Sequence, residues 1–326
     1  MIEAWSEYIQ EFRSQLTSEV REGCHPLKML HGEKRKHSIV LIHGLTDSPH
    51  YMKEIGRYFY ETLGFNVLIP LLQAHGLSKP RGMKDVSLDS WKHNVRFSIE
   101  EAQELGEKVS IGGLSTGGAL SVWFSLQDKS QVTGGLFLFS AALDLAGKRG
   151  ELEEFLLRTP YARWKDRFED REFPLIGDNP YRYDRMDKGG ATELSKLIRE
   201  LDKTLSSKTI LETLLPILKL GANSKADRAI SQKLFVAHSE ADEAADITAV
   251  EDLIAKSDPQ MVCSEVNATH SQFFRIAKQF NVSHASLVLK DPVFGLDGSP
   301  LEAENPFFDQ MMDSIRIFVT KYLPNA

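Results

Sequence analysis

The fold is decided by the stretch Val109-Ser110-Ile111-Gly112-Gly113-Leu114-Ser115-Thr116-Gly117-Gly118. Its first five residues have the pattern of a short buried strand, and a helix is expected at once over Thr116–Gln127. A serine between the two must sit on a tight turn, so small residues are needed on both sides, and Gly113 and Gly117 provide them. The G-x-S-x-G spacing therefore predicts a nucleophile elbow with Ser115 at the turn.

Working outward, the same strand and helix patterns alternate along most of the chain. Strands are expected at Ser38–Ile42, Asn66–Leu71, Val109–Gly113, Gly135–Ala141, Lys233–Ser239 and Phe273–Phe280. Helical spacing of apolar residues is found over Pro49–Leu63, Trp91–Ala102, Asp246–Leu253 and Phe308–Tyr322. Strands that alternate with helices predict a mostly parallel sheet that is covered by helices on both faces.

The alternation stops between Asp144 and Ala229, over about 85 residues that are charged, helical in period and rich in aromatic residues. We therefore expect three parts in the chain: an N-terminal helical arm over residues 1–37, an α/β core over residues 38–144 and 230–326, and an inserted helical cap over residues 145–229. The insertion fits a purely structural cap and a substrate-binding lid equally well.

Composition excludes several classes of function. The 39 Lys and Arg against 46 Asp and Glu give a formal charge of -7, which disfavours nucleic acid as a partner. Cys24 and Cys263 form no C-x-x-C or His/Cys ligand run, so structural zinc and redox chemistry are not expected. No apolar run approaches the ~20 residues of a membrane span. The sequence predicts a cytoplasmic protein without stable membrane insertion, although transient lipid contact fits an apolar stripe in the insertion.

A serine nucleophile at neutral pH needs a base, and the oxyanion that it creates needs preorganised N–H donors. His43-Gly44-Leu45-Thr46 follows the first central strand, where this kind of fold places one donor. We therefore assign the oxyanion hole to the backbone N–H groups of Leu45 and Thr116. The side chain of His43 is expected to be structural. No metal and no organic cofactor is needed for this chemistry.

In α/β folds with a nucleophile elbow the chain order of the triad is Ser, acid, His, so the acid should follow a late strand. Asp242 lies three residues past Ser239, the last residue of an expected strand. Asp246 is placed to cap the next helix, which is a structural role. Glu240 and Asp144, which follows an earlier strand, stay open as alternatives to Asp242.

Only two histidines, His270 and His284, come after Asp242 in the chain. His284 follows the expected strand Phe273–Phe280, whereas His270 precedes it and would lie at the opposite end of the sheet. Because sites in open α/β sheets form at the carboxyl ends of strands, His284 is the predicted base and His270 the alternative.

Five segments together resemble one known family: Leu41–Pro49, Ala74–Ser78, Gly113–Gly118, Ser239–Asp242 and Val282–Ala285. On these segments the sequence resembles the α/β-hydrolase superfamily, and within it the bacterial carboxylesterases and monoacylglycerol lipases, from about Ser38 to Leu323. The resemblance implies ester hydrolysis and a lid over the pocket. Two departures stand out: Ala74 where relatives usually have Gly, and the 42 residues from Asp242 to His284.

The sequence therefore predicts a serine carboxylester hydrolase with the triad Ser115, Asp242 and His284, acting on a small-molecule ester. One alternative is a serine aminopeptidase of the proline iminopeptidase kind, in which Glu151, Glu153 and Glu154 of the insertion could hold a substrate ammonium group. Another alternative is a non-catalytic binding protein with the same fold.

Overall fold

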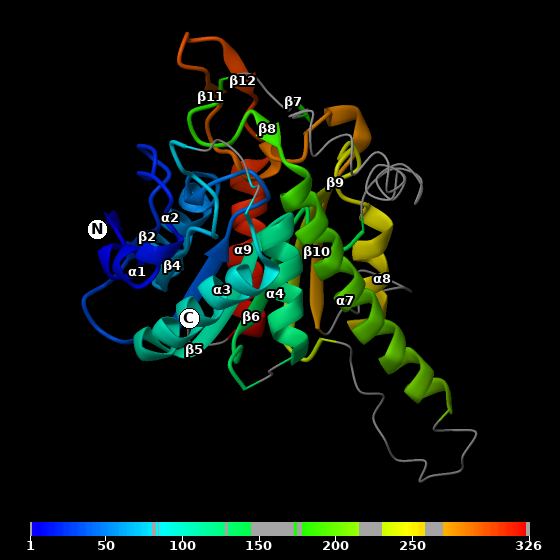
Figure 1. Ribbon diagram of the computed structural model, residues 1–326. Helices are drawn as coiled ribbons and strands as arrows, with labels where there is room; N and C mark the ends of the chain where they lie inside the picture. The colour runs from blue at the N-terminus through cyan, green and yellow to red at the C-terminus, as the bar shows by residue number, and fades with distance from the viewer. Residues whose placement is uncertain are drawn as a thin grey trace.

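The computed structural model describes residues 2–79, 83, 85–127, 130–144, 173–174, 178–214, 230–257 and 270–323. An eight-stranded sheet forms its centre, in the order β1-β2-β4-β3-β5-β6-β9-β10 (Figure 1). These strands are β1 (Ile2–Ala4), β2 (Leu27–Met29), β3 (Arg35–Ile42), β4 (Asn66–Ile69), β5 (Gly106–Leu114), β6 (Gly135–Phe139), β9 (Lys233–Ser239) and β10 (Ser271–Ile276). The strands from β4 to β10 in this order are parallel, and β1 and β2 are antiparallel to their neighbours.

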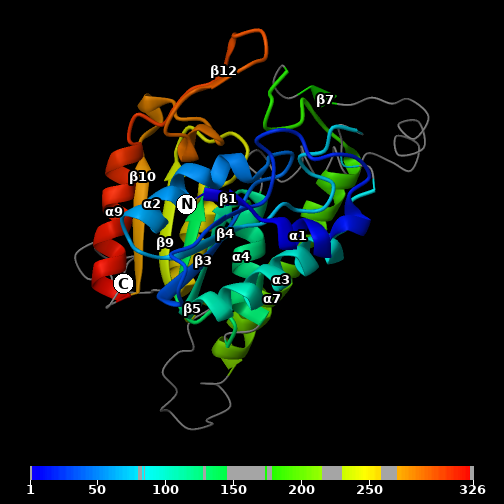
Figure 2. The same ribbon diagram turned by 90° about the vertical axis from the view of Figure 1, so that its left-hand side faces the viewer.

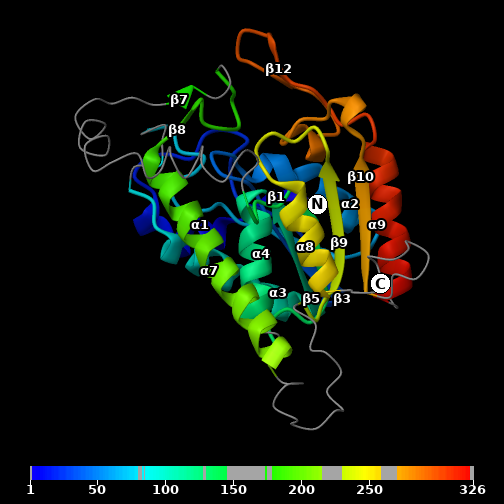
Figure 3. The same ribbon diagram turned by 90° about the vertical axis from the view of Figure 1, so that its right-hand side faces the viewer.

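Helices cover both faces of the sheet, as Figures 2 and 3 show. The principal helices are α1 (Ser6–Glu11), α2 (Lys53–Glu61), α3 (Leu88–Leu105), α4 (Thr116–Gln127), α7 (Lys188–Leu214), α8 (Ile247–Ser257) and α9 (Phe308–Tyr322). Alternate residues of β3 enter two separate apolar clusters: Val40 and Ile42 pack with α3, α4, α7 and α8, whereas Ile39 and Leu41 pack with α2 and α9. This two-sided burial explains the nearly continuous apolar strands of the sequence.

The remaining elements are short. They comprise the 3-10 helices η1 (Arg13–Gln15), η2 (Pro49–Met52), η4 (Lys278–Phe280) and η5 (Ser286–Val288), and the strand pairs β7 (Phe173–Pro174) with β8 (Arg185–Met186) and β11 (Val293–Phe294) with β12 (Pro300–Glu302). The hairpin of β11 and β12 projects beyond the sheet on the same side as β7 and β8 (Figure 1).

Most elements that the sequence predicts are confirmed, and α4, α9 and β9 keep the predicted bounds. The last strand differs. It was expected over Phe273–Phe280, but β10 ends at Ile276 and the chain turns through η4 into Asn281, whose φ is +49°. Asn tolerates this left-handed conformation better than most residues, so the chain reverses there and leads directly to His284.

The N-terminal segment differs from a purely helical arm. Residues 1–37 contain α1 and η1, but β1 and β2 extend the main sheet by two antiparallel strands. Three aromatic residues fix α1 to α3: the rings of Trp5, Tyr8 and Phe12 lie 6.0, 6.0 and 5.4 Å from the ring of Phe97. Aromatic packing therefore joins this segment to the core.

The described parts of the insertion are β7 and the continuous segment 178–214, which includes β8 and α7. α7 packs along α3 and α4, and its side chains Leu194, Leu197 and Leu201 are buried in the core cluster. Glu200 receives hydrogen bonds from Lys92 and Trp123, both at 2.7 Å. Residues 145–172, 175–177 and 215–229 lie outside the described residues, so the bounds of the cap stay a prediction. Of the helices in the described ranges, none has the length and apolar composition needed to cross a bilayer.

Candidate active site

Ser115 occupies a strained turn between β5 and α4. Its φ is +53°, a left-handed value that is costly for a residue with a Cβ. Two hydrogen bonds hold the turn: Ser115 N–H donates to the Phe139 carbonyl at 3.0 Å, and Ala142 N–H donates to the Ser115 carbonyl at 3.1 Å. A Cβ built on Gly117 would lie 2.1 Å from the Ile42 carbonyl oxygen. The glycines of the motif are therefore required by the close approach of β3, as an elbow demands.

An acid and a histidine meet at the same edge of the sheet. His284 Nδ1 lies 2.7 Å from Asp242 Oδ2, and the Asp242 side chain is fully buried. The other oxygen, Oδ1, accepts the backbone N–H groups of Ala244 at 2.8 Å and Ala245 at 3.0 Å. Burial raises the pKa of Asp242, but the bond from His284 and the two N–H groups outweigh it and lower the pKa to about 2. Because the ionised Asp242 accepts a hydrogen bond from Nδ1–H, it favours the tautomer of His284 whose lone pair is on Nε2, the nitrogen that can act as a base.

The alternative acids have other partners. Glu240 accepts a bond from Arg275 Nε at 2.6 Å, and Asp246 accepts Thr248 N–H at 2.8 Å at the start of α8. Asp246 therefore caps α8, as the sequence suggests. The carbonyl oxygen of Asp144 accepts Asp246 N–H at 3.1 Å. Asp242 is the acid that the structure bonds to His284.

His270 lies at the other end of the sheet. It stands just before β10, its carbonyl accepts Leu234 N–H at 3.0 Å, and its Nε2 lies 3.0 Å from the Ile230 carbonyl oxygen. Asp242 follows the opposite end of β9, and a seven-residue strand such as β9 spans roughly 23 Å. The structure thus brings Asp242 and His284 together and places His270 away from them.

The loop after β3 lies directly against Ser115. A Cβ built on Gly44 would be 3.3 Å from the Ser115 Cβ. The ring of His43 shapes this loop, because its Nε2 accepts Leu72 N–H at 3.1 Å while its Nδ1 lies 2.9 Å from the Gly44 carbonyl oxygen. Burial lowers the pKa of His43 well below its usual range, so the ring is neutral with the proton on Nδ1. These contacts agree with the structural role expected for His43.

The two expected oxyanion donors are the next residues in the chain after Gly44 and Ser115, which lie against each other. Thr116 is the first residue of α4, and the first N–H groups of a helix have no partner within it. Leu45 directly follows Gly44, and its Cδ1 would lie 3.3 Å from a Cβ built on Gly190 at the start of α7. Their assignment as oxyanion donors stays a proposal.

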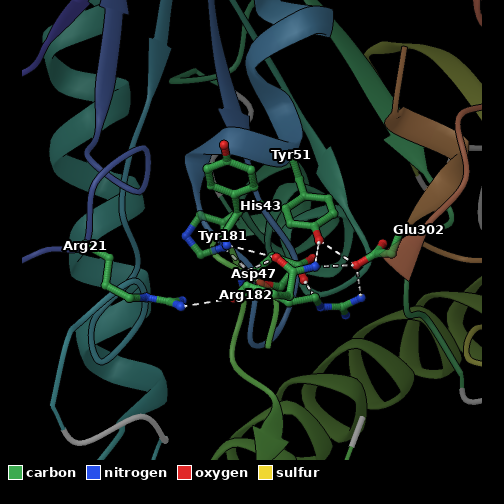
Figure 4. A network of polar contacts seen from close by, with 9 residues as sticks. Arg21, His43, Asp47, Tyr51, Tyr181, Arg182 and Glu302 are labelled. Carbon is green, nitrogen blue, oxygen red and sulfur yellow. Dashed lines mark hydrogen bonds and ion pairs between the residues drawn. The ribbon is translucent and has the colours of Figure 1, made fainter. Parts of the chain in front are cut away.

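A buried charged cluster beside this loop was not found by sequence reasoning. Arg182 Nε lies 3.1 Å from Asp47 Oδ1, and Arg182 Nη1 lies 3.0 Å from Glu302 Oε1, so the guanidinium lies between two carboxylates (Figure 4). Burial raises the pKa of Asp47 to about 6, even though Arg182 opposes the shift. Asp47 stands next to the His-Gly motif, which is a signal that could have marked it, whereas Arg182 comes from the insertion.

A second histidine approaches the acid. His238 Nε2 lies 3.6 Å from Asp242 Oδ2, and burial lowers the pKa of His238, so this ring is neutral in the core beside the acid. Within the described ranges, no group of three or more His, Cys, Asp or Glu side chains is arranged to hold a metal ion. The prediction that no cofactor is needed stays a prediction.

Comparison with known proteins gives the family. The model of the family Hydrolase_4, described as "Serine aminopeptidase, S33", matches residues 33–268. The chain belongs to this family. Among curated proteins, the thermostable monoacylglycerol lipase of Bacillus sp. (strain H-257) is 27% identical over 143 residues, which are 42% of this chain and 54% of the relative. The chain thus spans about half the length of the curated relative that it matches.

Solved structures of the same fold cover the chain almost completely. A structure from the study of LipS and LipT, two metagenome-derived lipolytic enzymes, is similar over 93% of this chain and 100% of its own, with a TM-score of 0.62 and 18% identity. The monoacylglycerol lipase of Paleococcus ferrophilus is similar over 91% of this chain and 98% of its own, with a TM-score of 0.58 and 14% identity. The α/β-hydrolase fold that the sequence predicts is confirmed.

Proposed function

We propose that the protein is a serine hydrolase that cleaves carboxylic esters through an acyl-enzyme on Ser115. The observation that carries the proposal is that three features follow parallel strands at the same sheet edge: the left-handed Ser115 with the Gly44 loop against it, Asp242, and His284, whose Nδ1 lies 2.7 Å from Asp242. A relative that is a monoacylglycerol lipase supports esters, and acylglycerols among them, as the substrate class.

Each group has one task in the proposed mechanism. Ser115 Oγ attacks the ester carbonyl while His284 Nε2 takes its proton, and the N–H groups of Leu45 and Thr116 stabilise the oxyanion. His284 then protonates the leaving alcohol, which departs and leaves the acyl-enzyme. Water attacks the acyl group with His284 as base, the acid is released and Ser115 is protonated again. Asp242 stays ionised throughout and stabilises the imidazolium.

The Ser115→Ala variant tests the nucleophile. It should lose about 10⁴-fold to 10⁶-fold of its ester turnover and all labelling by a fluorophosphonate probe, with an unchanged melting temperature. A folded variant with turnover near that of the parent would refute the assignment of Ser115. Absence of labelling in the parent protein would favour the non-catalytic alternative.

A second candidate, a serine aminopeptidase, is favoured by the description of the matching family. The three glutamates that could hold a substrate ammonium group, Glu151, Glu153 and Glu154, lie outside the described residues. A panel of p-nitrophenyl acyl esters and aminoacyl p-nitroanilides would distinguish the two activities. We expect kcat/KM to be higher for the esters, and the opposite order would establish the aminopeptidase.

We further propose that contact with lipid is transient and that the protein is cytoplasmic. We also propose that the insertion, residues 145–229, limits the acyl length of the substrate. The start of α7 supports this last point, because Gly190 lies against Leu45 of the loop beside Ser115. The test replaces residues 145–172 by a short linker and keeps the sequence of α7 unchanged. The folded variant should still react with a small fluorophosphonate but should show a changed preference among acyl chain lengths. An unchanged preference would make residues 145–172 dispensable for specificity.

A further inference from the structure

We propose that Arg182 is a positioning residue for the oxyanion loop, defined as residues 44–47. Through its ion pair with Asp47, Arg182 holds this loop, and with it the Leu45 N–H, in place beside Ser115. The inference rests on the proposed function, because the loop matters for turnover only if Ser115 is the nucleophile.

The oxyanion loop needs support from outside. Thr46 has a φ of +67°, the left-handed conformation that turns usually give to glycine. The turn is closed by Asp47 N–H, which donates to the Gly44 carbonyl oxygen at 3.3 Å, a long hydrogen bond. A strained conformation persists only where its surroundings over-determine it. The contacts that hold this loop are therefore part of what sets the position of Leu45.

Two of these contacts come from the segment that leads into β8. The N–H of Tyr183 donates to the Thr46 carbonyl oxygen at 2.9 Å, and Arg182 Nε lies 3.1 Å from Asp47 Oδ1. The Asp47 carboxylate lies over Gly44, since a Cβ built on Gly44 would be 2.5 Å from Asp47 Oδ2. Arg182 thus holds a carboxylate that packs on the residue that also contacts Ser115.

Arg182 is itself held rigidly. Its Nη1 lies 3.0 Å from Glu302 Oε1, and its guanidinium lies 5.6 Å from the centre of the Tyr51 ring. Tyr51 OH also donates to Glu302 Oε1, at 2.6 Å (Figure 4). Asn179 Nδ2 donates to the same oxygen at 2.9 Å. The side chains of Arg182 and Asp47 are only 11% and 3% exposed, so water screens their attraction poorly. Removal of the guanidinium would leave the Asp47 carboxylate buried without its partner cation.

Arg21 offers a matched control, because it holds the same segment from the side opposite to Glu302 (Figure 4). Its Nη1 donates to the Asn179 carbonyl oxygen at 3.2 Å, and its guanidinium lies 5.2 Å from the centre of the Tyr183 ring. Loss of Arg21 should loosen the segment as a whole without removing the ion pair to Asp47. It therefore separates general anchoring from the specific effect on the loop.

The test compares Arg182→Gln, Arg182→Lys, Asp47→Asn, the Arg182→Gln/Asp47→Asn double variant and Arg21→Gln. We would measure kcat and KM on a short p-nitrophenyl ester, the Kd of a trifluoromethyl ketone as transition-state analogue, and the melting temperature. Loss of one oxyanion donor costs about 10²-fold to 10³-fold in kcat, so a displaced donor should cost about 10-fold to 100-fold. Arg182→Gln should lower kcat by this factor and weaken the ketone equally, with KM within about twofold.

The other variants decide whether Arg182 acts through Asp47. The double variant should lose no more kcat than the worse single variant, because coupled residues are not additive. Arg182→Lys should recover part of the loss, and Arg21→Gln should keep kcat within about twofold at a lowered melting temperature. Three outcomes would overturn the inference. Arg182→Gln could change only KM or the melting temperature, Arg21→Gln could lose as much kcat as Arg182→Gln, or the losses of kcat in the double variant could be additive. If Arg182→Gln does not fold, Asp47→Asn gives the same decision. Turnover by Ser115→Ala would instead refute the proposed function.

Discussion

Two buried aspartates, Asp242 and Asp47, follow strands at the same edge of the sheet, yet their pKa values shift in opposite directions. The pKa of Asp242 is lowered to about 2, and that of Asp47 is raised to about 6. Burial raises the pKa in both cases. The difference therefore lies in the partners of each carboxylate.

Asp242 accepts three well-formed hydrogen bonds, from His284 and from the N–H groups of Ala244 and Ala245. Asp47 has the Arg182 cation, but the Glu302 carboxylate shares the same guanidinium and raises the pKa of Asp47 further. At Asp242 the hydrogen bonds to the charged form thus outweigh burial, whereas at Asp47 the shared Arg182 cation and a backbone hydrogen bond from Gly44 do not. Asp242 is therefore stabilised in its charged form beside His284, whereas the contacts of Asp47 do not fully offset the cost of burying its charge.

The strongest way to break the comparison is to remove the partner of Asp242. His284→Ala should lower kcat by about 10⁴-fold to 10⁶-fold, because no base remains for Ser115. His270→Ala should stay within about tenfold of the parent, because His270 lies at the other end of β9. Steady-state ester kinetics on both folded variants would check this, and the reverse ranking would make His270 the base.

The next effect concerns Asp242 itself. Asp242→Asn should lower kcat by about 10⁴-fold, because an amide can donate to Nδ1 and so favours the wrong tautomer of His284. Asp246→Asn is the matched control, since Asp246 caps α8, and Asn caps helices as well as Asp does. Its kcat should stay within about twofold. Equal losses in the two variants would remove Asp242 from the triad.

How much of the site the sequence could predict depends on how local the signal for each residue is. Ser115 could be proposed as the nucleophile because an elbow is a local motif, with its glycines two residues away on either side. Asp242 and His284 could be proposed because each comes within a few residues of the end of an expected strand. Arg182 could not, because it comes from a long interruption of the strand and helix alternation, and nothing in a single sequence indicates that it pairs with Asp47. Similarly, β1 and β2 have three residues each, too few to show a period.

The pH dependence of stability would sharpen the comparison. A carboxyl group whose pKa falls from 3.8 to about 2 on folding stabilises the fold above pH 4 and loses this contribution as the pH falls toward 2, so Asp242 makes stability rise with pH in that window. A pKa raised to about 6 means that folded Asp47 binds more protons than the unfolded chain between pH 4 and 6. Stability from Asp47 therefore falls as pH rises through that window.

We expect each contribution to amount to about 2 to 3 kcal/mol. Urea unfolding of the parent and of Asp47→Asn at several pH values measures the second contribution as a difference that changes between pH 4 and 6. The groups that act on Asp47 are Arg182, Glu302, His284 and the Gly44 backbone; because Glu302 raises the pKa of Asp47, the same series in Glu302→Gln should show a smaller change. A constant difference between the parent and Asp47→Asn across pH 4 to 6 would contradict the raised pKa of Asp47.

The smallest effect concerns backbone strain at Ala74, in the loop that follows β4. Ala74 has a φ of +63°, so the loop keeps a conformation suited to glycine although Ala stands there. A residue with a Cβ in the left-handed conformation destabilises the fold by about 1 to 2 kcal/mol. Glycine removes this strain, but the greater entropy of the unfolded chain offsets about 0.4 to 1 kcal/mol of the gain. Ala74→Gly should thus stabilise the fold by about 0.5 to 1 kcal/mol, which is a rise of about 1 to 3 °C in melting temperature.

Gly76 gives the matched reversal two residues further on. Its φ is +64°, and a Cβ built there would lie 3.0 Å from the Cys24 Cβ, so Gly76→Ala adds both strain and crowding. It should lower the free energy of unfolding by about 1 to 3 kcal/mol. Thermal unfolding of Ala74→Gly and Gly76→Ala, measured side by side, compares the relief of backbone strain with the addition of strain and crowding. If Ala74→Gly destabilised the protein, the packing of the Ala74 methyl group against the core would outweigh its backbone strain.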